Sequence, residues 1–174
     1  MRHTRSPVLI LALGNDLLGD DAVALRAARA LQRRDMRGID ILESGEAGFA
    51  LLERITDYER VFVIDAMYTR CHPVGTVVYL SDHDFDETES PSPHYAGLPD
   101  LRRLAEAMNI PYPREIEIIA MEVGDPYTIR EELTQQVQTA LPAYVDEIIR
   151  SLTMKPARRR VSHDAAGTRE EVHT

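Results

Sequence analysis

The sequence predicts an α/β protein, a sandwich of helices around a mostly parallel sheet. Two observations carry this prediction. Short apolar runs alternate with stretches whose apolar residues recur at helical spacing, which is the pattern of βαβ units. The first apolar run, residues 8–13, contains no polar residue, as expected of a strand that is covered on both faces.

The first half of the chain contributes three strands and two helices. Residues 8–13 form the first strand, and the helix over residues 22–34 gathers its apolar residues on one face and its arginines beside it. A second strand at 39–42 and a helix at 47–55 follow. The third strand, 60–65, is strongly apolar. Right-handed crossovers place the second strand beside the first.

The second half adds two strands and two helices. The strand at 76–80 follows the third strand after a gap too short for a helical crossover, so we expect it to run antiparallel. A helix at 98–108 precedes the fifth strand at 115–121. Residues 127–152 show a long amphipathic pattern, which predicts a helical region that Pro142 kinks or divides.

The length of 174 residues suits a single domain. We assign this domain to residues 1–152, because residues 153–174 are polar, carry three consecutive arginines and lack apolar periodicity. The prediction is therefore one α/β domain followed by a disordered tail.

Composition excludes several classes of function. Twenty Lys and Arg against 29 Asp and Glu give a net charge of −9, so nucleic acid is not an expected partner. The single cysteine, Cys71, excludes an intramolecular disulfide framework, and its ordinary loop context does not favour a nucleophile. No stretch is long enough to span a bilayer, and the N-terminus lacks a signal-peptide pattern. We expect a cytoplasmic protein without a membrane partner.

Acidic residues follow two of the predicted strands. Asp20 and Asp21 come just after the first strand and its Gly14-Asn15 turn, and Asp65 ends the third strand. If the third strand pairs with the first on the side away from the second, the chain reverses direction between them, and ligands of open α/β sheets bind at such a point. The simpler alternative is that these acids cap a helix or form a turn.

His94 lies on a loop stiffened by Pro93, just before a predicted helix. Together with two carboxylates it would form a site suited to a divalent ion such as nickel, zinc, manganese or iron. The alternative is a solvated loop histidine. The sequence contains no dinucleotide fingerprint, no phosphate-binding lysine loop and no nucleophile elbow of the Gly-x-Ser-x-Gly type.

At these positions the chain resembles the hydrogenase maturation endopeptidases, which finish the large subunit of nickel-iron hydrogenases. Four short blocks carry the resemblance in family order, and residues 133–142 resemble the family's C-terminal helix. The blocks are Gly14-Asn15-Asp16-Leu17-Leu18-Gly19-Asp20-Asp21, Ser44-Gly45-Glu46-Ala47-Gly48, Val63-Ile64-Asp65-Ala66 and Ser92-Pro93-His94-Tyr95-Ala96-Gly97-Leu98.

The resemblance implies a three-layer α/β/α sandwich around a mixed, mostly parallel five-stranded sheet. It also implies an aspartic-type endopeptidase that removes the C-terminal extension of a hydrogenase large-subunit precursor after nickel insertion. The family's metal-binding residues fall on Asp21, Asp65 and His94. The family's glycine-rich turn, which we expect to bind substrate, falls on Gly45, Glu46, Ala47 and Gly48. The metal would be nickel carried by the precursor, or another divalent transition ion, and we expect the protease to be a monomer.

Two questions stay open at the level of sequence. The ion could polarise the scissile carbonyl or activate water, or it could only dock the substrate while Asp21 or Asp65 acts as general base. A non-catalytic, metal-dependent chaperone for the immature subunit is the alternative function. A domain without a site, in which the acids only cap helices, is a third hypothesis.

Overall fold

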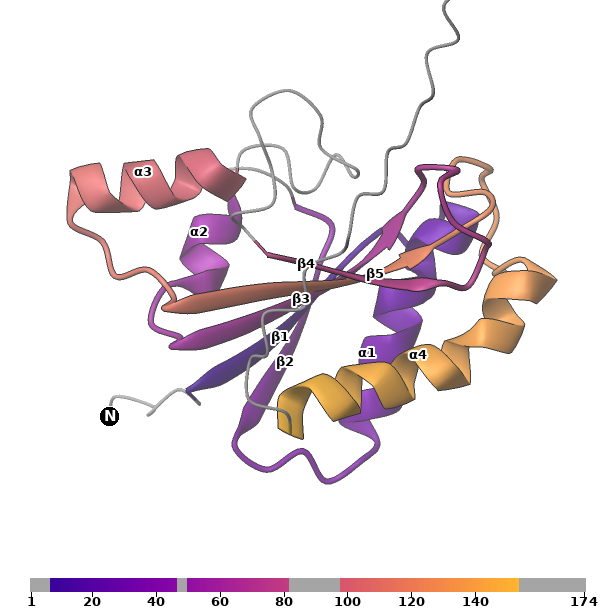
Figure 1. Cartoon of the computed structure of the whole chain (residues 1–174), viewed down its shortest axis with the longest axis horizontal. Coiled ribbons are helices and arrows are strands. Elements are labelled where there is room, and N and C mark those ends of the chain that lie inside the picture. The colour runs from indigo at the N-terminus through magenta and orange to yellow at the C-terminus, as the bar shows by residue number, and fades with distance from the viewer. Residues whose placement is uncertain (1–6, 47–49, 82–97, 154–174) are drawn as a thin grey trace, which may run out of the picture.

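In a computed structural model of the chain, residues 7–46, 50–81 and 98–153 are described (Figure 1). They form five strands, four α-helices and one short 3₁₀ helix. In chain order these are β1 (Val8–Leu13), η1 (Gly19–Ala22), α1 (Val23–Gln32), β2 (Ile39–Ser44), α2 (Ala50–Ile55), β3 (Arg60–Met67), β4 (Val77–Ser81), α3 (Leu98–Met108), β5 (Glu115–Glu122) and α4 (Gln135–Thr153).

The five strands form one mixed sheet in the order β2-β1-β3-β5-β4. β1 pairs in parallel with both β2 and β3, with Ile10 opposite Ile41 on one side and Phe62 on the other. β5 is parallel to β3, whereas β4 is antiparallel to β5. The predicted antiparallel orientation of the fourth strand is therefore confirmed.

Helices cover both faces of this sheet, so the three-layer α/β/α sandwich is also confirmed. Helices α2 and α3 lie on one face, and α1 and α4 lie on the other (Figure 1). Side chains of β1 alternate between the two cores, with Leu11 among the residues packed under α2 and α3 and Ile10 among those packed under α1 and α4. Both side chains are fully buried, as the uninterrupted apolar run of β1 predicted.

Several predicted boundaries are wrong. Residues 127–134 are not helical, because Arg130 pairs with Leu18 in an isolated parallel bridge and α4 begins only at Gln135. Thr134 precedes that helix, and its Oγ1 accepts the Val137 N–H at 3.4 Å, as in an N-cap. Pro142 does not divide α4, which runs uninterrupted to Thr153. Thr153, the first residue of the predicted tail 153–174, belongs to α4, and residues 154–174 and 47–49 lie outside the described part of the chain.

The parallel strands end at one side of the sheet, here called the carboxyl edge. At this edge the direction in which successive strands are placed across the sheet reverses. β2 lies on one side of β1 and β3 lies on the other, so the predicted switch point falls between β1 and β3. Among the described residues, no helix has the length and apolar character needed to cross a membrane.

Candidate active site

A glycine brings the loop after β1 close to the end of that strand. Gly14 has φ +149°, and a Cβ atom on it would lie 2.2 Å from the carbonyl oxygen of Asp21, so no other residue fits there without movement of the backbone. The Gly14 N–H donates to the Ser44 carbonyl at 3.2 Å, and the Asp21 N–H donates to the Leu18 carbonyl at 3.0 Å. The loop thus folds back and holds Asp21 beside the carboxyl end of β1.

The two adjacent acids of this loop have different surroundings. Asp20 is fully buried, and its carboxylate accepts hydrogen bonds from the backbone N–H groups of Thr134 (2.6 Å), Asp125 (3.0 Å) and Gly124 (3.3 Å) and from the Thr134 hydroxyl (3.0 Å). The alternative that Asp20 caps the helix it begins is wrong, because η1 has no side-chain cap. Asp20 instead fixes the segment between β5 and α4, whereas the neighbouring Asp21 is half-buried.

The second predicted acid, Asp65, lies inside β3 and not at its end, because the strand continues to Met67. Its side chain is fully buried, and its Oδ1 accepts the Ala66 N–H at 2.8 Å. A buried carboxylate is stable only when it is hydrogen-bonded, paired or bound to a cation. This placement is what a ligand site at the switch point requires, although a hydrogen bond to a neighbouring amide is also what the simpler turn hypothesis predicts.

A buried tyrosine holds the backbone of Asp65. The Tyr144 hydroxyl donates to the Ile119 carbonyl at 2.6 Å and accepts the Asp65 N–H at 3.2 Å, so α4 is connected to both β3 and β5. Burial, and then the negative charge of Asp65, raise the pKa of Tyr144 well above its ordinary value. The tyrosine is therefore a neutral hydrogen-bond donor at neutral pH.

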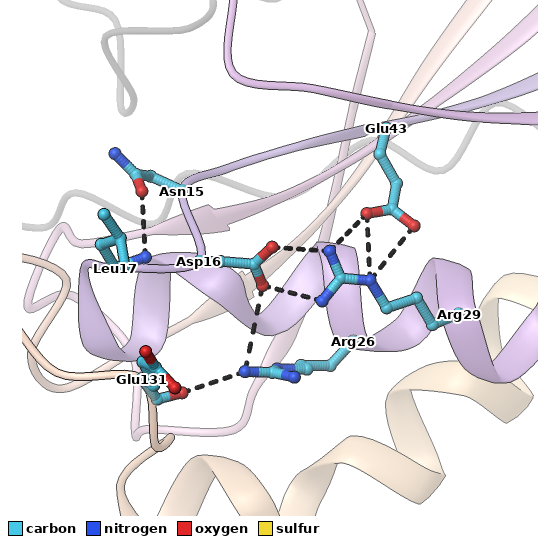
Figure 2. Close-up of polar contacts among 7 residues, drawn as sticks. All are labelled: Asn15, Asp16, Leu17, Arg26, Arg29, Glu43 and Glu131. Carbon is cyan, nitrogen blue, oxygen red and sulfur yellow. Dashed lines mark hydrogen bonds and ion pairs between the residues drawn. The ribbon is translucent and has the colours of Figure 1, made fainter.

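An ion cluster holds the same loop from the outside (Figure 2). The Arg29 guanidinium on α1 donates to both carboxylate oxygens of Asp16, at 2.8 and 2.6 Å, and also to Glu43 at the end of β2, at 2.6 Å. Arg26, one turn earlier, donates to the Glu131 carbonyl at 3.0 Å. The hydrogen bond from Arg29 lowers the pKa of Asp16. α1 is thereby joined to the loops that follow β1 and β5 and to the end of β2.

A family model described as hydrogenase maturation protease matches residues 25–151 of the chain. The chain belongs to the hydrogenase maturation protease family. It is accordingly an endopeptidase, as the resemblance of its sequence blocks implied.

Named relatives of this protease match it over most of their length. The Hydrogenase 2 maturation protease of Escherichia coli strain K12 is 27% identical over 172 residues, which cover 95% of this chain and 98% of the relative. The solved [NiFe] hydrogenase maturation protease HybD from Thermococcus kodakarensis is 31% identical with a TM-score of 0.64, covering 84% and 99% of the two chains. The Escherichia coli endopeptidase HybD, with a TM-score of 0.70 at 24% identity over 83% and 91%, shares the fold.

The structure of this protease brings two of the three predicted metal-binding residues to one edge of the sheet. Asp21 follows β1 and Asp65 lies near the end of the adjacent β3. His94 lies outside the described residues, so the three-residue site stays a prediction. Within residues 7–46, 50–81 and 98–153 no group of three His, Cys, Asp or Glu side chains is arranged to hold a metal ion.

The predicted substrate turn is described only in its first half. Gly45 and Glu46 are exposed at the carboxyl end of β2, whereas Ala47 and Gly48 lie outside the described residues. Glu46 pairs with Arg54 of α2 at 3.0 Å, and that hydrogen bond lowers the Glu46 pKa. Arg54 thus balances the negative charge of Glu46. The role of this turn in substrate binding stays a prediction.

Sequence reasoning missed a third buried carboxylate at this edge. Glu122 ends β5, is fully buried, and accepts the backbone N–H groups of Thr69 and Arg70 at 2.8 Å and the Thr69 hydroxyl at 2.6 Å. It fixes the loop that follows β3. The signal was present in the sequence, because Glu122 follows an apolar run directly, as Asp65 does.

Proposed function

We propose that this protease removes the C-terminal extension of a nickel-iron hydrogenase large-subunit precursor after nickel has been inserted. The observation that carries the proposal is the position of Asp21 and Asp65 at the switch point between β1 and β3, in a chain that belongs to the hydrogenase maturation protease family. Ligands of open α/β sheets bind at such a point.

The nickel in this proposal belongs to the substrate. The carboxylates of Asp21 and Asp65 and the imidazole of His94 recognise the nickel held by the precursor, and the peptide bond to be cut then lies against the carboxyl edge. Oxygen and nitrogen donors of this kind suit nickel and neighbouring divalent ions. The full burial of the Asp65 carboxylate supports this role, because the charge of a cation offsets the cost of keeping a carboxylate away from water.

The rigidity of the site supports a proteolytic role over simple binding. Gly14, Tyr144 and the Arg29 cluster fix the backbone around both carboxylates, and cleavage requires reacting groups to be held in one geometry. Exposed Gly45 and Glu46 lie at the end of β2, where we propose that they contact the extended chain of the precursor.

The test is to incubate the purified protease with precursor in nickel-loaded and nickel-free forms and to measure intact masses. We expect the nickel-loaded precursor to lose its C-terminal extension and the nickel-free precursor to remain intact. His94→Ala should abolish processing, whereas His72→Ala, in the loop after β3, should not. Formation of a complex without a change of mass would instead favour the chaperone hypothesis, and equal cleavage of both precursor forms would contradict recognition through nickel.

A further inference from the structure

Exposed apolar side chains of the described residues gather beside the candidate site. Four large apolar side chains are more than half exposed among these residues: Leu17 (56%), Met108 (55%), Tyr127 (72%) and Ile129 (84%). Three of the four belong to the loops after β1 and β5, at the carboxyl edge. Met108 lies elsewhere, at the end of α3, in the chain that leads to the start of β5.

Backbone pairing brings the two loops together at two of these exposed residues. The Arg130 N–H donates to the Leu17 carbonyl at 3.0 Å, and the Gly19 N–H donates to the Arg130 carbonyl at 2.8 Å, which makes Leu18 and Arg130 parallel partners. Leu17 and Ile129 each directly precede a partner of this bridge, so the chain at these two exposed residues runs side by side.

Aromatic rings continue this surface toward the end of β3. Tyr127 packs edge to face against Tyr68, with ring centroids 5.5 Å apart, and Arg70 lies over the Tyr68 ring at 4.9 Å. The loops that follow β3 and β5 lie side by side at the same end of the molecule (Figure 1). The side chains of Leu17, Tyr68, Tyr127 and Ile129, here called the apolar rim, belong to the loops after β1, β3 and β5.

The rim is held in place before any partner binds. Asp20 accepts the Asp125 N–H, Asp125 Oδ1 accepts the Thr128 N–H at 3.1 Å, and Arg26 holds the Glu131 carbonyl. An exposed apolar surface on a fixed backbone loses little conformational entropy on binding. Exposed aromatic and aliphatic groups that are grouped in this way mark interaction surfaces.

The charges beside the rim restrict what binds there. Exposed Glu131 and Glu132 directly follow Ile129 and Arg130, and the chain as a whole carries −9. Because each copy carries a net charge of −9, repulsion between like charges disfavours the pairing of two copies through this rim. A partner with an apolar surface and an adjoining basic group complements both the rim and its acidic border.

We propose that the apolar rim is the docking surface for the precursor itself, which contacts Leu17 and Ile129 through apolar side chains and the Glu131–Glu132 border through a basic group. This inference rests on the proposed function and deepens it, because it assigns the affinity for the substrate to a surface beside the carboxylates. The carboxylates act on the bound precursor, and the rim determines how tightly it binds.

The experiment measures kcat and KM for shortening of the nickel-loaded precursor by the double variant Leu17→Ser/Ile129→Ser, with Met108→Ser as the matched control. We expect the double variant to raise KM at least about tenfold, which corresponds to about 1.4 kcal/mol, with kcat within about twofold. Met108→Ser should leave both constants within about twofold. Glu131→Lys/Glu132→Lys should also raise KM, and added salt should weaken that effect.

The outcomes separate this inference from the proposed function. If the unmodified protease does not shorten the precursor, the proposed function fails. If it does, and KM of the double variant equals that of the unmodified protease, the rim is not the docking surface. Sedimentation tests whether a second copy of the protease occupies the rim. A dimer that dissociates in the double variant would overturn the proposal. A lowered unfolding temperature with unchanged KM would also overturn it, because another segment of the same chain would then cover the rim.

Discussion

At the carboxyl edge of the sheet the carboxylates of Asp20, Asp65 and Glu122 are fully buried, whereas at the amino edge the charged pair of Arg60 and Glu115 is half-exposed. The buried carboxylates accept hydrogen bonds from backbone N–H groups. The two residues of this half-exposed pair lie directly opposite each other across β3 and β5, with a distance of 2.8 Å between Arg60 Nε and Glu115 Oε2. At the carboxyl edge, buried carboxylates therefore hold loop backbone in place, whereas at the amino edge this ion pair joins the side chains of two strands.

The surroundings of one glycine at each edge also differ. Gly14 at the carboxyl edge and Gly38 just before β2 at the amino edge both have positive φ, +149° and +78°. A Cβ atom on Gly14 would collide with the Asp21 carbonyl, whereas nothing lies within 4 Å of a Cβ atom on Gly38. At the carboxyl edge the backbone folds tightly around the candidate site, whereas Gly38 lies in an open connection between α1 and β2.

The largest effect is expected from the two glycines. Gly14→Ala should destabilise the protein by about 4 kcal/mol, because the backbone around Asp21 has to move, and should also stop processing. Gly38→Ala should cost only about 1 kcal/mol, which is the strain of a side chain at positive φ. Urea unfolding of both variants measures the difference. Equal losses of unfolding free energy in the two variants would mean that crowding at the carboxyl edge does not affect stability.

The buried carboxylate of Asp20 comes next. Asp20→Ala should lower the free energy of unfolding by about 3 kcal/mol, since it leaves the N–H groups of Asp125 and Thr134 without their acceptor. Glu115→Ala should cost less than about 1 kcal/mol, because its ion pair is half-exposed. Denaturant titration compares the two. A larger loss for Glu115→Ala would reverse the proposed contrast between the edges.

Two tyrosine hydroxyls give a smaller and sharper test. Tyr144→Phe should cost about 1.5 kcal/mol, because the Ile119 carbonyl and the Asp65 N–H lose a buried partner. Tyr58→Phe, before β3 at the amino edge, should cost about 0.5 kcal/mol, since its partner Asp40 is only half-buried and can bind water instead. Thermal unfolding of both variants measures this contrast, and a greater loss for Tyr58→Phe would refute it.

The smallest effect concerns pH. Arg29 holds the folded-state pKa of Asp16 below its ordinary value of 3.8, so this pair stabilises the protein above about pH 4 and loses that contribution as the pH falls through the lowered pKa. Because the Asp16 side chain is 41% exposed, we expect less than about 0.5 kcal/mol. Asp16→Asn should lower the unfolding temperature at pH 6, and this difference should shrink as the pH falls below about 4. A difference that does not change with pH would assign the effect to packing, and Asp35→Asn, in an exposed pair with Arg37, is the control.

The sheet could be predicted from the sequence because its signals are local. An uninterrupted apolar run specified β1, and the short gap before β4 specified its antiparallel direction. The segment 127–134 was predicted wrongly because its conformation is set by distant partners. Its apolar spacing favours a helix, but the pairing of Arg130 with Leu18 and the hydrogen bonds from Thr134 to Asp20 keep α4 from beginning before residue 135.

The candidate site was predicted in part for the same reason. Asp65 is visible in the sequence as an acid at the end of an apolar run, and the same rule, applied to Glu122, would have found the third carboxylate. The different roles of Asp20 and Asp21 could not be read from adjacent, identical residues, because they depend on a loop more than 100 residues away. Local pattern finds buried acids, and only the fold shows what each of them contacts.

The most direct test of the central claim is the intact mass of nickel-loaded precursor after incubation with Asp21→Asn, Asp65→Asn and Glu115→Gln. Asparagine keeps the size of each aspartate, so folding is expected to be retained, and circular dichroism checks it. We expect both carboxyl-edge variants to lose processing at least about 100-fold, while Glu115→Gln at the amino edge processes the precursor at the unmodified rate. Processing by Asp21→Asn and Asp65→Asn at the unmodified rate would contradict the claim that the carboxyl edge holds the active site.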